Sequence, residues 1–218
     1  MTSEAREEVL ERARRALAGV PAGEAPEDVA VERGYRHDDP APREEILARF
    51  AERVADYRVG VRRVAAGGVA DAVRLACLAH GAHRLAVPRD LPDSWRAEGV
   101  EWVEDEDLTH AELDAVDGAL TGCALGIAET GTLVLDGGER QGRRALSLLP
   151  DLHLCVIDEG QVVGSVPEGV ARLGPAVRDE GRPLTFVSGP SATSDIELDR
   201  VEGVHGPRTL EVLVVAPG

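Results

Sequence analysis

The feature that most constrains this fold is an alternation of short apolar runs with helical patterns, which starts at residue 59. The clearest runs are 85–87, 152–157 and 209–215, and all are made almost entirely of Val, Leu, Ile and Ala or Cys. Runs without polar alternation are typical of parallel strands buried on both faces, and the intervening segments supply the covering helices. With right-handed crossovers, we expect an α/β fold: a three-layer α/β/α sandwich around a mostly parallel sheet, plus N-terminal helices.

The expected strands are bounded by glycine, proline and polar residues. They cover 59–64, 85–87, 101–103, 116–121, 132–135, 152–157, 184–187 and 209–215. Residues 116–121 and 132–135 are expected to pair around a small loop. Helices are expected between Gly68 and Gly81, near 142–149 and at 167–173.

The N-terminal residues lack the alternation of strand and helix patterns seen in the rest of the chain. A capped helix from Ser3 is followed by a proline-rich loop at 20–42 and by a second helix at about 43–58. The predicted division is a helical arm over residues 1–58 and an α/β domain over residues 59–218.

The charge of the chain excludes some classes of partner. It has 40 acidic and 24 basic residues, for a net charge of −16. Phosphate backbones and anionic lipid surfaces would repel it, so we expect no nucleic acid and no membrane as partners. Every basic residue is arginine, which excludes both a Schiff-base lysine and a phosphate-loop lysine.

The three cysteines, Cys77, Cys123 and Cys155, lie far apart and form no CxxC pair. This spacing argues against a disulfide scaffold and against a thiolate-ligated metal or iron–sulfur site in this chain. No nicotinamide or flavin fingerprint occurs, so we expect no cofactor and no metal. The acidic N-terminal stretch resembles neither a signal nor a transit peptide, and a cytoplasmic location is expected.

Three loops rich in glycine and polar residues are expected beyond the carboxyl ends of strands, where α/β sheets bind ligands. The first covers 126–132 and places Glu129 beside Thr130 and Gly131. Glu129 is a candidate base or nucleophile, and Thr130 and Gly131 are candidate ligand-binding residues. A tight hairpin turn with an exposed glutamate is the alternative.

The second loop covers 188–197 and combines hydroxyl groups with free backbone amides. Ser188, Gly189, Ser191 and Asp195 are candidates for an anion cradle. The capping of a following helix turn would explain the same composition.

The third loop, 203–208, sets a histidine and an arginine between glycines and a proline. His205 is a candidate for proton transfer and Arg208 for the bidentate binding of a carboxylate or phosphate. Arg144 is a further candidate partner for a carboxylate ligand. A structural histidine and a solvated helix start are the alternatives for His205 and Arg144.

Four segments in this order resemble the LUD family, specifically its lactate-utilisation protein C type. They are GIAETGTLVLD (126–136), RRALSLLPDLHLCVI (143–157), FVSGPSATSDIEL (186–198) and GVHGPRTLEVLVV (203–215). The resemblance implies a fold like that of the NagB/RpiA/CoA-transferase superfamily. It also implies a role beside two iron–sulfur partner proteins in oxidising L-lactate to pyruvate. The residues that match the family pattern include Glu129, Thr130, Gly131, Arg144, Ser188, Gly189, Ser191, Asp195, His205 and Arg208. Ala192 departs from it, standing where relatives often carry a larger polar or basic residue.

Three functions stay open on the sequence. In the first, the chain binds a small anionic ligand, such as a small carboxylate, or a partner, as one component of lactate oxidation. In the second, it is an independent enzyme related to CoA transferases, sugar-phosphate isomerases or formyltetrahydrofolate cyclo-ligases, with Glu129 as nucleophile or base. In the third, it is a scaffold whose acidic surface and N-terminal arm bind partners.

Overall fold

The computed structural model describes residues 3–21, 23, 25, 28, 30–32, 34–190 and 206–218. The chain divides into two compact units, residues 1–35 and residues 36–218. The first unit contains helix α1 (Ser3–Ala16), which has Glu4 in its first turn and Arg14 and Arg15 in its last. That order of charges stabilises a helix through its dipole.

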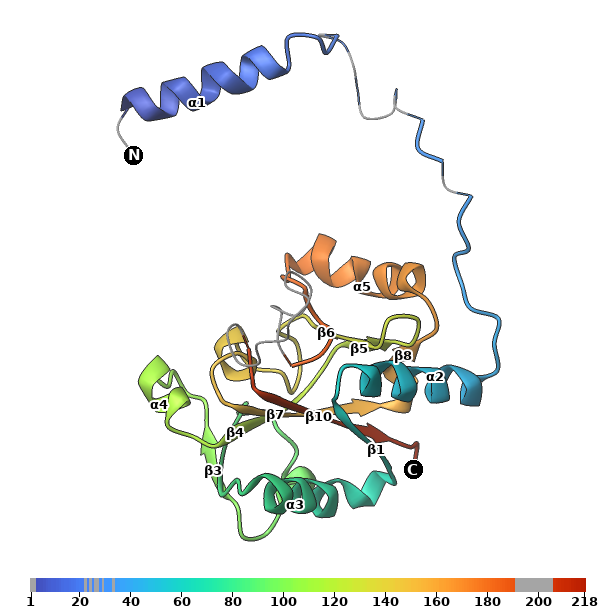
Figure 1. The fold of residues 1–218 in the computed structure, drawn as a ribbon, viewed down its shortest axis with the longest axis vertical. Coiled ribbons are helices and arrows are strands. Elements are labelled where there is room, and N and C mark those ends of the chain that lie inside the picture. The colour runs from blue at the N-terminus through green and yellow to red at the C-terminus, as the bar shows by residue number, and fades with distance from the viewer. Residues whose placement is uncertain are drawn as a thin grey trace. The chain divides into compact units, whose positions relative to one another are not determined.

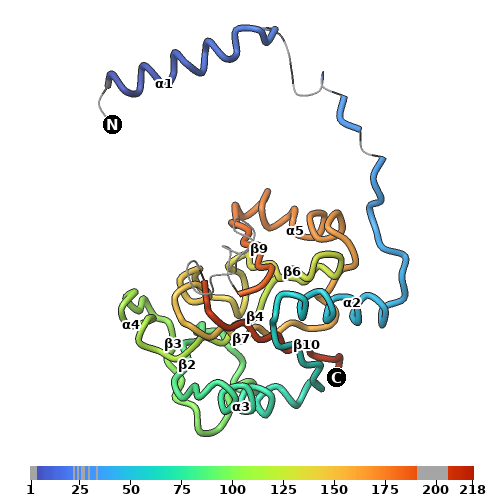
Figure 2. Tube along the Cα trace, viewed as in Figure 1, coloured from blue at the N-terminus to red at the C-terminus, as the bar shows by residue number. Residues whose placement is uncertain are grey.

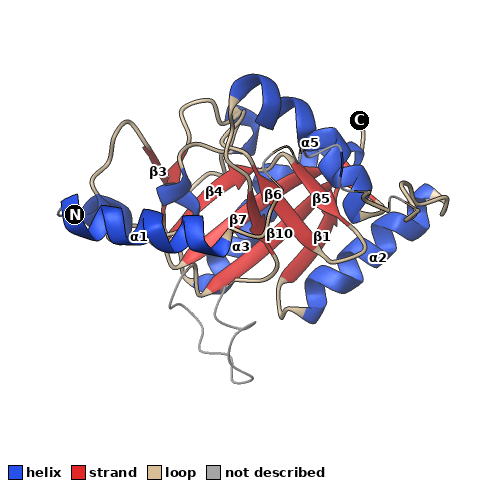
Figure 3. Ribbon diagram, turned by 90° about the horizontal axis from the view of Figure 1, so that it is seen from above, coloured by secondary structure: helices blue, strands red, loops and turns tan. Residues whose placement is uncertain are grey.

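The larger unit is built on a six-stranded sheet in which every pairing is parallel. Its central strands run side by side in Figure 3. The strand order is β1 (Gly60–Val64), β10 (Thr209–Val215), β7 (Leu152–Asp158), β4 (Gly118–Gly122), β2 (Arg84–Val87) and β3 (Glu101–Glu104).

A second, four-stranded sheet was not expected from the sequence. Its order is β8 (Val162–Val163), β5 (Leu125–Ile127), β6 (Thr132–Leu135) and β9 (Thr185–Val187). The expected pairing of 116–121 with 132–135 is therefore wrong, because β4 and β6 belong to different sheets. Strand β6 pairs antiparallel with β5 and with β9, and the three residues of β5 are too few to show a strand period.

The side chains of the central strands alternate between two cores. On β7, Leu154 and Val156 face helix α3 (Val69–His80), whereas Cys155 and Ile157 face helix α2 (Arg43–Asp56) and the second sheet. Helix α5 (Val166–Glu180) covers the outer face of the second sheet through Leu173. Figure 1 shows this order of layers, and the tube in Figure 2 shows β6 and β9 beneath α5. The α/β fold with a parallel sheet and covering helices is confirmed.

The remaining elements are short. Helix α4 (His110–Asp114) is accompanied by single 3₁₀ turns: η2 (Ala66–Gly68), η3 (Asp93–Trp95), η4 (Arg144–Ser147) and η5 (Glu159–Gln161). The helix expected near 142–149 is only the turn η4. Helix α5 is longer than expected and continues past Pro175. Nowhere in the described residues is there a helix with the length and apolar character that crossing a bilayer requires.

Helix α2 belongs to the compact body, which differs from the division expected at residue 58. The compact unit begins at Arg36. Helix α2 buries Ile46, Leu47, Phe50 and Val54 against the sheets, and Phe50 has no exposed surface. The burial of these side chains therefore groups α2 with the α/β body.

We predict that Phe50→Ala destabilises the body by about 3–5 kcal/mol, because it removes a fully buried ring and leaves a cavity. Urea unfolding of the purified chain measures this loss. The control is Leu78→Ala on α3, where the side chain is 64% exposed and the change should stay within about 0.5 kcal/mol. Equal stability of the two variants would show that α2 is not part of the folded core.

Candidate functional site

A chain of three hydroxyl groups joins the tip of the β5–β6 hairpin to the end of β9. Thr132 Oγ1 lies 2.7 Å from Thr130 Oγ1 and 2.7 Å from Ser188 Oγ. The Tyr57 hydroxyl donates to the Thr130 carbonyl at 3.3 Å. The loop 126–132 is thus brought together with Ser188, the first residue of the second loop singled out in the sequence. Thr132 is a member of this chain of hydroxyl groups that the sequence analysis did not name.

Close packing against α2 fixes this hairpin tip. Gly131 has φ +64°, and a Cβ there would lie 2.5 Å from the carbonyl carbon of Arg53. Gly189, with φ +93°, packs against the Tyr57 side chain. Glycine is needed at both positions for conformation and space. Arg53, Tyr57 and Thr130 also line an open cavity of about 340 Å³ beside the tip.

Glu129 points from the hairpin toward helix α5. Its Oε2 accepts the backbone N–H of Val166 at 3.1 Å, in the first turn of that helix. A carboxylate at a helix N-terminus is stabilised by the free N–H groups and by the helix dipole. This contact gives Glu129 an anchoring role in the described structure, although its side chain is also open to solvent.

The location of these loops corrects an expectation. The hairpin tip packs on the last turn of α2, next to the amino end of β1, and Arg208 immediately precedes β10. Both therefore lie at the amino ends of strands of the six-stranded sheet, and not beyond the carboxyl ends. For Arg208 the reason is that it comes directly before β10 in the chain.

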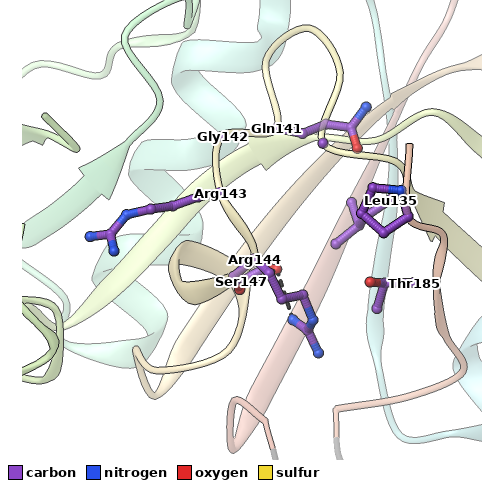
Figure 4. Close-up of a pocket in the computed structure, with 9 residues that line it drawn as sticks. Leu135, Gln141, Gly142, Arg143, Arg144, Ser147 and Thr185 are labelled. Carbon is purple, nitrogen blue, oxygen red and sulfur yellow. Dashed lines mark hydrogen bonds between the residues drawn. The ribbon is translucent and has the colours of Figure 1, made fainter. Parts of the chain in front are cut away.

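Arg144 lies on the turn η4, which crosses the face of the large sheet. It lines a small cavity of about 40 Å³ with Ser147, Gln141, Leu135 and Thr185. Figure 4 shows the Arg144 guanidinium on the side of Ser147 and Thr185, with Arg143 pointing the opposite way. Arg144 Nη1 donates to Ser147 Oγ at 3.0 Å. Partial burial lowers the pKa of Arg144, and no carboxylate pairs with it among residues 3–190 and 206–218 that the structure describes.

The neighbouring arginines, Arg143 and Arg140, make contacts that stabilise the fold. Arg143 forms a bidentate pair with the buried carboxylate of Asp105, at 2.7 and 2.8 Å. The guanidinium of Arg140 lies over the Trp95 ring, 5.3 Å from its centroid. Arg140 also lies 3.6 Å from Asp158, so both neighbours have carboxylate partners, whereas Arg144 has none in the described structure.

A buried histidine near Arg144 was missed by the sequence analysis. His153 is only 2% exposed, and its Nε2 lies 2.8 Å from Thr121 Oγ1. Burial, with a smaller contribution from the positive charge of Arg144, lowers the pKa of His153 to about 4. The side chain is thus neutral near pH 7. Nothing in the apolar run 152–157 marks it as unusual, so only the fold reveals it.

The other predicted residues contribute less to this picture. Arg208 is exposed and pairs with Asp151 at 3.2 Å, at the amino ends of β10 and β7. Ser191, Asp195 and His205 lie outside the described residues, so their predicted roles stay predictions.

Three comparisons place this chain among known proteins. The family model described as LUD domain matches residues 2–215. Lactate utilization protein C of Deinococcus radiodurans is 48% identical over 215 residues, covering 98% of this chain and 97% of that protein. Lactate utilization protein C of Geobacillus thermodenitrificans is 27% identical over 201 residues, covering 84% and 80%. The crystal structure of a DUF162 family protein from Deinococcus radiodurans has a TM-score of 0.71 and 46% identity, covering 81% of this chain and 99% of that one.

We predict that His153 makes the fold acid-sensitive. Its pKa is about 4 when folded, against 6.5 for an unperturbed histidine, so the unfolded chain binds more protons between these values. Stability should be complete above about pH 6.5 and fall by about 3 kcal/mol as the pH drops to about 4. Urea unfolding at several pH values measures this, and His153→Gln should flatten that part of the profile. The exposed His110→Gln is the control, and an unchanged profile in His153→Gln would contradict the assignment.

Proposed function

The chain belongs to the LUD domain family, and from this premise we propose that it acts in lactate utilisation by binding a small carboxylate through Arg144. The relatives called lactate utilization protein C support the pathway. Their names say nothing of the ligand, which is inferred below from the site.

The observation that carries the proposal is the state of Arg144. Its guanidinium lines the cavity beside Ser147 and has no carboxylate partner in the described structure. The residue as a whole is exposed, but partial desolvation of its guanidinium lowers its pKa. Desolvation of a cation is unfavourable unless a counter-charge offsets it, and a bound carboxylate would supply that charge. The planar guanidinium can also bind both oxygens of a carboxylate at once.

The size and lining of the cavity favour a small acid. At about 40 Å³ it holds about three waters, which suits the head of a compact carboxylate better than a nucleotide or CoA. The hydroxyl groups of Ser147 and Thr185 lie in the same lining and can serve a 2-hydroxy or 2-oxo group. Neutral His153 adds no competing charge nearby.

The positions of the cysteines indicate whether this chain could hold an iron–sulfur cluster that accepts electrons from lactate. Oxidation of lactate to pyruvate releases two electrons and two protons, so an electron carrier must accept them. All three cysteines are buried, and Cys77 lies in the core under α3 whereas Cys123 and Cys155 lie on the opposite face of the sheet. These thiols cannot converge on one cluster, which needs several ligands at one point. We therefore propose that iron–sulfur partner proteins accept the electrons.

The independent-enzyme alternative rests on Glu129 as nucleophile or base. The hydrogen bond from Val166 to its carboxylate favours the anchoring role instead. In the lactate proposal, Glu129 holds the hairpin that carries Thr130 and Gly131 in place. The hydroxyl chain at its tip is then a second polar surface, next to β1.

We predict that lactate and pyruvate raise the unfolding temperature of the wild-type chain and that Arg144→Gln abolishes this shift. A ligand at 100 times its dissociation constant adds about 2.7 kcal/mol, which is a few degrees for a domain of this size. Arg178→Gln is the matched control, since it removes the same charge at an exposed position outside the lining of this cavity and should keep the full ligand shift. A shift that persists in Arg144→Gln would remove this residue from the site.

We also predict that the purified chain alone does not oxidise lactate, whatever artificial electron acceptor is present. Addition of the iron–sulfur partner proteins should give lactate-dependent acceptor reduction, and Arg144→Gln should lower its rate at low lactate concentration. Dye-linked assays of each protein alone and of the mixture measure this. Oxidation of lactate by the chain alone would contradict the proposal that partner proteins accept the electrons.

A further inference from the structure

A second cavity lies beyond the carboxyl ends of β4 and β7. It has a volume of about 310 Å³ and shares Gln141 with the Arg144 cavity. Its lining includes Cys123, which follows β4, and Gln161, which follows β7. In open α/β sheets the crevice outside the carboxyl ends is where ligands bind. This is the edge that the loops predicted from the sequence do not occupy.

The strand connections change direction between β2 and β4, next to this cavity. The strands β2 and β4 are neighbours in the sheet. The next large-sheet strand after β2 is β3, at the edge, whereas the next one after β4 is β7, on the opposite side. Neighbouring strands whose connections leave in opposite directions create a crevice between their ends. Arg140 bridges this point, since its N–H donates to Asp90 after β2 at 2.7 Å and its carbonyl accepts the Gly122 N–H at the end of β4 at 2.6 Å.

Three arginines from separate segments line this cavity: Arg140 from the loop after β6, Arg172 from α5 and Arg182 from the segment after α5. Arg182 pairs with Asp136 at 3.2 Å. Arg172 donates to the Gly160 carbonyl at 3.0 Å, and within the described residues it has no carboxylate partner. Arg140 lies 3.6 Å from Asp158, and Arg182 also pairs with Glu180 at 2.6 Å. Arg172 is therefore the cation of this lining whose charge no described carboxylate offsets.

The backbone at Arg140 is strained in a way typical of binding sites. Its φ is +62°, a region that favours glycine, although glycines stand nearby at 137, 138 and 142. Strain of this kind persists where the surroundings hold it in place, and it gathers at ligand clamps. Here Asp90, Gly122 and the Trp95 ring hold Arg140 at the mouth of the crevice.

We propose that this cavity binds a small molecule carrying a phosphate or diphosphate group. Three guanidinium groups from different directions match the several oxygens and the multiple charge of such an anion. The side-chain amide of Gln141 keeps one N–H beyond its bond to Asp136, whereas both N–H groups of Gln161 donate to the carbonyls of Cys123 and Ala124. This site is separate from the Arg144 cavity, and the inference does not depend on the proposed function in lactate utilisation.

The test is calorimetric titration of the full chain with inorganic pyrophosphate at about 0.15 M salt, where long-range attraction is screened. We expect saturable binding that Arg172→Gln weakens by about tenfold, the effect of losing one charged hydrogen bond. Arg178→Gln is the matched control, because it removes the same charge from the same helix but does not line the cavity. Its affinity should change by less than about twofold, and that of Arg144→Gln likewise.

Three results would overturn the proposal. One is the absence of saturable pyrophosphate binding by the wild-type chain. Another is equal weakening by Arg172→Gln and Arg178→Gln, which would indicate a diffuse charge effect. The third is tighter binding of citrate than of pyrophosphate, which would exclude phosphate as the preferred class. Circular dichroism of each variant verifies that it is folded.

Discussion

The rest of the structure depends on the parallel ladder between β7 and β10. These strands pair over seven residues and are flanked by β4 and β1. Alternate side chains bury into opposite cores, so each strand must be apolar on both faces. Leu154, Val156 and Leu213 pack against α3, whereas Cys155, Ile157 and Val212 lie toward α2 and the second sheet.

The absence of lysine shapes the electrostatics of the chain. Every cation is a planar guanidinium with several donors, so a structural arginine can hold a carboxylate by two bonds and still contact backbone carbonyls. Arg143 does this with Asp105 and with the Leu108 carbonyl. Against such ion pairs, an arginine that lacks a carboxylate partner and lines a cavity is a candidate for binding an anionic ligand. Arg144 and Arg172 are such residues in the described structure, and each lines a cavity.

The sequence predicted what depends on local periodicity. The strand 132–135 and the helix at about 43–58 were confirmed, because apolar spacing alone determines them. The second sheet was missed, since β5 and β8 have three and two residues and gain their stability from neighbours. The candidate site was predicted only in part. Glycine and hydroxyl patterns found the hairpin tip, but the relation between Arg144 and His153 depends on contacts across the fold.

Residues of the loop from Asp136 to Gly142 line both cavities. The Gln141 side chain accepts from the Asp136 N–H at 2.8 Å and donates to its carboxylate at 2.7 Å, and it lines both cavities. Arg182 holds the same carboxylate from the far side. Any displacement of Gln141 would change both linings together, because one buried network fixes them. The two cavities therefore share a wall whose position is set by hydrogen bonds and not by apolar packing.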